Sequence, residues 1–227
     1  ERFYADGDNA LHSFCHADGR YHLMGCILSA AGCNTWWLED ILGARDYQTY
    51  NEEVERAGDG GVFFLPYLMG ERSPHNDVDA RGAFIGLSGS TTRGEMGRAV
   101  MEGVAFALKS CLDAAGKSGA APTETNLCGG GAKSAVWRRM IADILNLPVH
   151  TLKTEQGPAY GAAILAMTAC GVYDSVHAAV AAVVKTDKTT LPNAKSVKTY
   201  RKKYEIFQKM YPALKEIFHE IKASSQA

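Results

Sequence analysis

The sequence has no strong excess of charge of either sign. Its 24 Lys and Arg residues nearly balance its 25 Asp and Glu residues, which leaves a formal net charge of −1 over 227 residues. We therefore expect neither nucleic acid nor an anionic membrane surface as a partner. It also has no apolar run long enough to span a bilayer. The longest nearly uncharged stretch, 156–184, is rich in Ala and Gly and is predicted to form buried helix.

The sequence contains no CxxC pair. Six cysteines are scattered along it, at Cys15, Cys26, Cys33, Cys111, Cys128 and Cys170. In a chain of this length, cysteines within apolar patterns are typical of reduced, buried thiols, and we expect a cytoplasmic location. His12, Cys15 and His16 match no zinc spacing, and alternation along a strand sends Cys15 to the face opposite the two histidines. We predict no metal site there or elsewhere.

The chain begins with Glu1 and shows no secretory leader pattern, and we expect a processed product or a fragment of something longer. Hairpin strands come first and strand–helix alternation follows, which favours an α/β fold with a mixed sheet flanked by helices. Strands are predicted within 11–27, as a hairpin around Asp18-Gly19, and over 62–68, 82–87, 124–128 and 148–152. Helices are predicted over 28–42, 46–57, 92–116, 134–145 and 158–169. A 3-4 apolar alternation from 197 to 221 predicts one long helix, or two with a bend at Pro212.

Three consecutive glycines interrupt LCGGGAKSAVWRRMIADIL (127–145) between a strand and a helix. Free N–H groups at such a turn and the dipole of the following helix favour an anion, and missing side chains let a ligand approach the backbone. Ser134 is predicted to cap the helix, and Lys133 adds a positive charge. Alone, the pattern is more typical of a tight turn than of a nucleotide site, because it matches neither GxGxxG nor a Walker A loop.

The stretch MGERSPHNDVDARG (69–82) is a long polar loop. Glu71, Arg72 and His75 are candidates for a ligand-binding cleft, since polar loops often touch ligands. The alternative is a self-satisfied loop in which Glu71 and Arg72 pair with other groups. Asp77 and Asp79 are predicted to be solvated loop acids. Asp143 is predicted to lie on the surface of the helix over 134–145.

Several stretches together resemble the C-terminal half of the FGGY family of carbohydrate kinases. GAFIGLSGSTTRGEMGRAVMEG (82–103) is similar to the family's C-terminal signature. Within it, Thr92 and Glu95 fit a helix-starting capping box. Within the family, HSFCHA near the start, FLPYLMGERSPHND and the glycine segment are most similar to bacterial xylulokinases. The resemblance covers nearly the whole chain, from about His12 to the final helix.

The resemblance implies a fold of the actin-like ATPase, ribonuclease H-like class. It makes residues 1–227 a single domain, the nucleotide-binding half of a two-domain sugar kinase whose N-terminal sugar-binding domain is absent. Family members bind adenosine at residues that correspond to Gly86, Gly129, Gly130, Gly131, Lys133, Ser134 and Ala135. The general-base aspartate and a phosphate loop belong to the part preceding this chain, so no catalytic residue is assigned here.

The implied reaction is attack of a ketopentose hydroxyl, most simply that of D-xylulose, on the γ-phosphate of MgATP. The expected ligands are ATP or ADP, with Mg²⁺ held mainly through the phosphates and the absent half. The pentulose sugar would bind through that half, and a homodimer is a further expected partner. The chain alone is predicted to be inactive. Two alternatives stay open: a stand-alone actin-like binding or assembly module, and a gluconate, glycerol or ribulose kinase of the same family.

Overall fold

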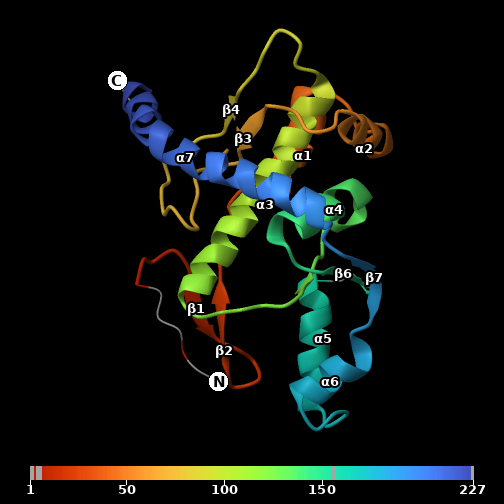
Figure 1. Ribbon diagram of the computed structural model, residues 1–227. Coiled ribbons are helices and arrows are strands. Elements are labelled where there is room, and N and C mark those ends of the chain that lie inside the picture. Colours follow the sequence, from red (N-terminus) through yellow and green to blue (C-terminus); the bar gives the residue numbers. More distant parts are fainter. Residues whose placement is uncertain (1–2, 4–6, 155–156, 226–227) are drawn as a thin grey trace.

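We describe a computed structural model of the chain that covers residue 3, residues 7–154 and residues 157–225 (Figure 1). The strands are β1 (His12–Cys15), β2 (Tyr21–Met24), β3 (Phe63–Leu65), β4 (Ala83–Ile85), β5 (Thr125–Asn126), β6 (Val149–Leu152) and β7 (Thr186–Thr190). The helices are α1 (Gly32–Thr35), which continues as a π-helical segment (Trp36–Ile41), α2 (Tyr47–Arg56), α3 (Arg93–Lys117), α4 (Ala135–Leu145), α5 (Gly157–Ala169), α6 (Val176–Val183) and α7 (Ala194–Ser224). Among these residues, every helix is too short or too polar to cross a membrane.

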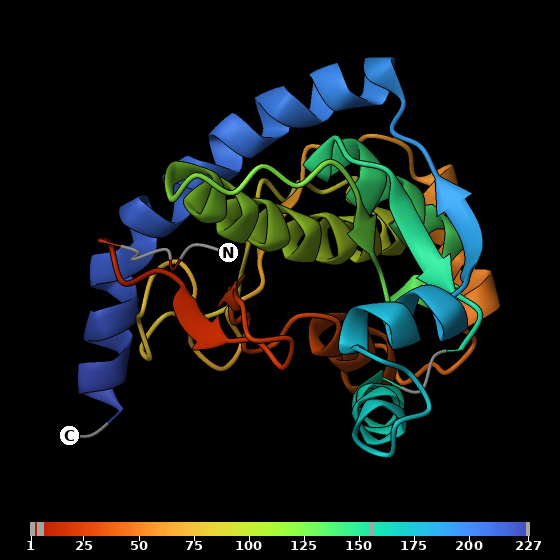
Figure 2. The same ribbon diagram turned by 90° about the horizontal axis from the view of Figure 1, so that it is seen from below.

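Helix α3 forms the centre of the core and passes through the middle of the molecule in both views (Figures 1 and 2). It begins with the predicted capping box: Thr92 Oγ accepts the Glu95 backbone N–H, and the Glu95 carboxylate accepts the Thr92 N–H. All residues from 99 to 107 are buried. A helix that is buried on every face must be surrounded by other elements. α3 packs against β3, α2, α4 and α7.

Two glycines on α3 let its neighbours approach closely. A Cβ atom on Gly103 would lie 2.3 Å from the carbonyl oxygen of Phe64 in β3, and one on Gly97 would lie 2.6 Å from the ring of Tyr50 in α2. Both distances are shorter than any that real Cβ atoms adopt. The missing side chains therefore set the distance between α3 and these two elements.

In the described part of the chain, the strands form three small sheets. β1 and β2 pair antiparallel around the predicted turn, in which Gly19 has a φ of +83°. β3 and β4 also pair antiparallel. In the mixed third sheet, β5 runs parallel to β6 and β7 runs antiparallel to it. β7 was not predicted, because its sequence TDKTT has no apolar face and most of it is exposed.

Helix α7 is continuous over Ala194–Ser224 although it contains Pro212. Proline has no backbone N–H to bond to the preceding turn, and Figure 2 shows that the helix is curved along its length. Its aromatic side chains pack on α3, with the Phe207 and Tyr204 rings 5.2 and 5.9 Å from the Phe106 ring between centroids. One long helix is thus the correct alternative of the two.

A buried carboxylate connects α3 to α7. Glu102 is 2% exposed and accepts hydrogen bonds from Arg98 Nε at 2.7 Å and from the Tyr200 hydroxyl at 3.1 Å. Lys203 of α7 also donates to it. Because a buried charge is costly unless it is paired and hydrogen-bonded, this complete set of partners favours one placement of α7 over α3.

The polar loop 69–82 is held by its own backbone and by a buried acid. The N–H groups of Glu71 and Asp77 each donate to the other's carbonyl oxygen at 2.8 Å. The Glu71 side chain is 1% exposed, and its Oε1 accepts the backbone N–H groups of Leu28 and Arg72. Oε2 has no hydrogen-bond partner among the described residues. Burial raises the pKa of Glu71 to about 7.

The prediction that Asp77 is a solvated loop acid is wrong. Its side chain is 8% exposed, and Oδ2 accepts the Tyr211 hydroxyl at 2.7 Å and lies 3.0 Å from His219 Nε2. Both partners belong to α7, more than 130 residues later in the chain. His75 of the same loop stacks on the Tyr211 ring, with 3.8 Å between centroids. Local sequence gives no sign that α7 covers this loop.

The expectation of buried helix across 156–184 is also wrong. α5 and α6 do form there, but Ile164 and Ala179 are their only buried residues among those described. Leu165 is 42% exposed. Figure 1 shows both helices at one end of the molecule, away from α3. An Ala-rich composition predicts a helix without showing whether another layer covers it; residue 156 itself lies outside the described residues.

Two other placements differ from prediction. All six cysteines are free, but Cys15, Cys128 and Cys170 are exposed rather than buried. Asp143 is 9% exposed, and its Oδ1 accepts the backbone N–H of Asn193 at 2.6 Å, so it is not a surface residue of α4. The segment that leads into α7 covers it, which helical periodicity within α4 cannot show.

We expect Gly103→Ala to destabilise the fold by about 3 kcal/mol, because the new Cβ collides with the Phe64 carbonyl and forces α3 away from β3. Gly116→Ala on the same helix is the matched control. A Cβ there meets nothing within 4 Å, so it should stabilise by about 0.5–1 kcal/mol. Urea unfolding followed by circular dichroism measures both. Equal effects of the two variants would contradict the close approach of α3 to β3.

We expect Glu71→Gln to become more stabilising as pH rises. Its folded-state pKa of about 7 lies above the ordinary value of 4.5, so the folded chain binds the extra proton between these values. Ionisation therefore costs the wild type nothing below about pH 4.5 and its full penalty above about pH 7. The variant should gain about 2 kcal/mol relative to wild type between pH 5 and pH 8. Urea unfolding at both pH values tests this, and a pH-independent difference would contradict it.

Candidate functional site

The glycine turn after β5 forms one wall of a pocket. Gly129 has a φ of +84°, a short 3-10 turn follows over Gly130–Lys133, and α4 begins at Ala135. Ser134 caps this helix as predicted, because its Oγ accepts the Trp137 backbone N–H at 3.2 Å. The turn therefore ends at a helix N-terminus, where N–H groups and the helix dipole favour an anion.

Trp137 fixes this wall to the core. Its side chain is 3% exposed, and its indole Nε1 donates to the carbonyl oxygen of Met101 in α3 at 2.9 Å. A Cβ on Gly131 would lie 3.1 Å from the Trp137 ring. The glycine turn thus rests directly on an anchored aromatic side chain.

Helices α1 and α2 form the opposite wall. Asp46 caps α2 by accepting the backbone N–H groups of Gln48 and Thr49. The Tyr47 hydroxyl donates to Glu39 Oε1 at 2.9 Å, which holds its ring between the two helical segments. The Tyr50 side chain is 2% exposed and packs into the core. Other side chains of α2, among them Tyr47 and Asn51, face the glycine turn across the cavity.

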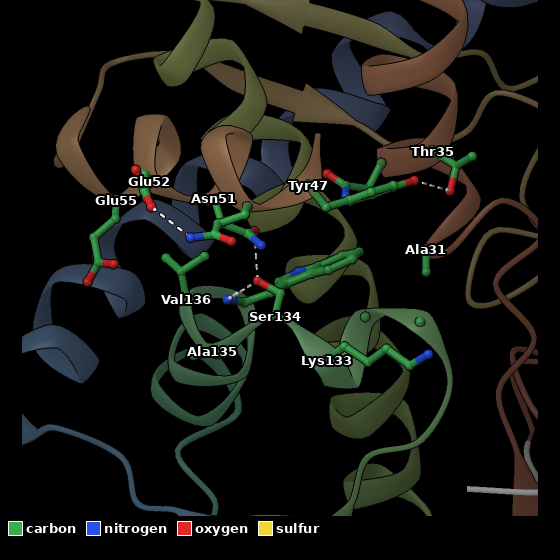
Figure 3. A pocket seen from close by; sticks show the side chains of 15 residues that line it. Ala31, Thr35, Tyr47, Asn51, Glu52, Glu55, Lys133, Ser134, Ala135 and Val136 are labelled. Carbon is green, nitrogen blue, oxygen red and sulfur yellow. Dashed lines mark hydrogen bonds between the residues drawn. The ribbon is translucent and has the colours of Figure 1, made fainter. Parts of the chain in front are cut away.

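A cavity of about 640 Å³ lies between these walls (Figure 3). From α1 and α2 it is lined chiefly by Asn34, Thr35, Tyr47, Gln48, Asn51 and Glu52. From the glycine turn and α4 it is lined chiefly by Gly130, Gly131, Lys133, Ser134, Ala135 and Trp137. A volume of this size is typical of sites for small molecules and cofactors.

Hydrogen bonds and charges are unevenly distributed around the cavity. The Ser134 hydroxyl donates to Asn51 Oδ1 at 2.8 Å, which joins the two walls (Figure 3). Glu55 at the rim pairs with Arg139. Lys133 has no ion-pair partner among the described residues. The cavity thus offers apolar surface, a carboxamide and a free lysine beside a helix N-terminus.

Five of the seven residues assigned by resemblance to nucleotide binding line this cavity. These are Gly130, Gly131, Lys133, Ser134 and Ala135. Gly129 starts the turn without lining the cavity, and neither does Gly86, which follows β4. Gly86 has a φ of +89°, and a Cβ on it would lie 2.4 Å from the Gly61 carbonyl oxygen. Backbone packing alone therefore requires glycine at position 86.

The loop candidates lie elsewhere. Glu71, Arg72 and His75 do not line the cavity. Glu71 is buried inside its loop, Arg72 donates to Asn76 and His12, and His75 contacts Tyr67 and α7. These contacts favour the reading of 69–82 as a self-satisfied loop.

Sequence reasoning missed the wall formed by α1 and α2. Its one visible signal is a polar helix over 46–57 that places Tyr47 and Asn51 one turn apart. In the described part of the chain, three side chains able to bind a metal come together in one place, at Asp77, Asp79 and His219. That group lies between the polar loop and α7, outside the cavity, and Asp77 already accepts hydrogen bonds there.

Comparisons with known proteins identify the family. Residues 8–170 match the model of the FGGY family of carbohydrate kinases, C-terminal domain. The chain is 37% identical over 218 residues to the xylulose kinase of Escherichia coli strain K12, covering 94% of this chain and 45% of the relative. Curated relatives such as this one are about twice as long as the chain.

Two solved structures from Lactobacillus acidophilus have similar backbones. A ligand-bound xylulose kinase superposes with a TM-score of 0.86 at 29% identity, covering 95% of this chain and 44% of that one. A gluconate kinase gives 0.86 at 28% identity, covering 97% and 45%. These neighbours confirm the predicted actin-like ATPase fold. The chain belongs to the FGGY family of carbohydrate kinases and corresponds to their C-terminal domain.

Proposed function

We propose that this chain is the ATP-binding C-terminal domain of a cytoplasmic sugar kinase. The full protein would transfer the γ-phosphate of ATP to a hydroxyl of a ketopentose, converting D-xylulose to D-xylulose 5-phosphate. The observation that carries the proposal is the cavity between α2 and the glycine turn, where five residues assigned to nucleotide binding come together. The similarity to the xylulose kinase of E. coli supports the choice of sugar.

The geometry divides the nucleotide between two parts of the cavity. The apolar part, with Tyr47 and the Trp137 ring, suits a purine and its ribose. The glycine turn offers backbone N–H groups, the start of α4 and the Lys133 ammonium, which suit the phosphates. Gly129 begins the glycine turn, whereas Gly86 packs against the Gly61 carbonyl oxygen and does not line the cavity. Mg²⁺ would be held mainly through the phosphates and the other half of the protein.

Phosphoryl transfer also needs a base beside the attacking hydroxyl and charge neutralisation around the phosphates. The residues of this cavity position the nucleotide but include no aspartate. We therefore assign the general base and the sugar contacts to the N-terminal half of the complete kinase. Closure of the two halves would then bring sugar and ATP together and exclude water.

A second candidate is a binding module that uses the same fold without catalysis. The outer face of α7 carries Ile206, Ile217 and Ile221, each about half exposed, which is the kind of surface that docks a partner helix. Calorimetry with ATP, followed by sizing chromatography, separates the candidates. If ATP does not bind and the chain forms a stable complex with a partner protein, the binding module is favoured.

We expect the chain to bind ADP and Gly130→Val to weaken that binding at least tenfold. A Cβ on Gly130 meets nothing within 4 Å, so the valine projects into open space in the cavity without disturbing the fold. Isothermal titration calorimetry measures the affinity. Gly161→Val on α5, also in open space, is the matched control and should bind ADP like wild type. Unchanged affinity in Gly130→Val would place the nucleotide elsewhere.

We expect the chain alone to show no phosphorylation of D-xylulose with MgATP in a coupled ADP-release assay. Fusing the preceding half of the E. coli xylulose kinase to it should restore turnover, because that half would supply the base and the sugar contacts. The same fusion carrying Gly130→Val is the control and should lose most of its activity. Turnover by the isolated chain would refute the division of roles.

A further inference from the structure

Asn51 is the polar side chain best placed to read the base of a bound nucleotide. It lies on α2, half-buried, and lines the cavity opposite the glycine turn. Figure 3 shows Asn51 next to Ser134, to which it is joined by a hydrogen bond. We propose that Asn51 selects adenine over 6-oxopurines by pairing with the N6/N7 edge of the base. This inference rests on the proposed nucleotide site.

The orientation of the Asn51 carboxamide is fixed by a chain of hydrogen bonds. The Trp137 backbone N–H donates to Ser134 Oγ at 3.2 Å, and the Ser134 hydroxyl donates to Asn51 Oδ1 at 2.8 Å. A reversed amide would lose the acceptor for the serine proton. The Trp137 indole in turn donates to the Met101 carbonyl oxygen of α3, so this series of hydrogen bonds starts in the core.

This arrangement leaves the two groups that adenine needs. Asn51 Nδ2 has no hydrogen-bond partner among the described residues, so both of its N–H groups can donate to a ligand. A carbonyl oxygen accepts two hydrogen bonds, so Oδ1 retains one free lone pair. Adenine offers N7 as acceptor and the N6 amine as donor, the pair that asparagine binds with two hydrogen bonds. A 6-oxopurine instead presents O6 to Oδ1, and two acceptors repel.

Other polar groups of the cavity are less suited to this role. Asn34 is 5% exposed, and its Oδ1 accepts the buried Tyr50 hydroxyl. The Thr35 hydroxyl lies within hydrogen-bonding distance of the Tyr47 hydroxyl. Gln48 points its amide toward Glu52 at 3.5 Å and is exposed. Of these three carboxamides, that of Asn51 is the one oriented by a hydrogen bond from Ser134, the residue that caps α4.

The test compares ADP with inosine diphosphate, which has O6 in place of the N6 amine. In calorimetry, we expect wild type to bind ADP about tenfold more tightly than inosine diphosphate. Asn51→Ala should reduce that ratio to about two or less, since neither base edge is read. Asn51→Asp keeps the acceptor and loses the donor to N7, so both affinities should fall while the preference for ADP persists. Gln208→Ala on α7 is the control for an amide removed elsewhere.

The outcomes separate the two proposals. An unchanged ratio in Asn51→Ala, with ADP still bound, overturns the role of Asn51 and leaves the nucleotide site standing. Failure of wild type to bind either nucleotide overturns both. Thermal unfolding of each variant accompanies the titrations. If Asn51→Ala does not fold, the ADP affinity of Asn51→Asp decides, and an affinity equal to that of wild type overturns the proposal.

Discussion

The close approach of α3 to its neighbours determines where everything else in the molecule lies. A helix normally keeps a side-chain layer between its backbone and the next element. At Gly103 the carbonyl oxygen of β3 occupies the space of that layer, and at Gly97 the Tyr50 ring of α2 does so. A third contact, between Gly94 and the Glu53 carbonyl oxygen, brings α2 against the start of the same helix. A methyl group added to any of these glycines would remove the contact, so the short distance between α3 and its neighbours depends on the missing side chains.

Both walls of the cavity depend on that helix. The α2 wall is placed by Tyr50, which packs on Gly97 and donates to the Asn34 side chain of α1. The glycine-turn wall is placed by Trp137, whose indole bonds to the Met101 carbonyl. Gly97 and Met101 lie one turn apart on α3, so both walls contact the same helix at adjacent positions, and this fixes their separation. The Ser134–Asn51 hydrogen bond then closes the remaining distance.

What the sequence could predict follows from the range of the interactions involved. The Thr92–Glu95 capping box, the hairpin at Asp18-Gly19 and the Ser134 cap are all contacts within a few residues, and each is present. Asp77 was misplaced because its partners are on α7, and the α5–α6 pair was misplaced because burial depends on layers that composition does not describe. The family resemblance supplied the glycine-turn half of the cavity, but the α2 half consists of polar residues whose pattern is that of any exposed helix.

Charge gives the cavity a direction. Figure 3 shows Lys133 at one end and Glu52 and Glu55 at the other. A nucleoside triphosphate carries several negative charges, and near a protein surface each unit-charge contact at close range is worth roughly a few kcal/mol before screening. Glu55 is already paired with Arg139, so Glu52 is the charge that disfavours phosphates at the α2 end, whereas Lys133 favours them at the turn. In the proposed site, a nucleotide with its phosphates at the turn would place its base beside α2, next to Asn51 and Tyr47. In the proposed site, the charges that would bind the nucleotide would thus also decide which of its ends lies beside the Asn51 carboxamide.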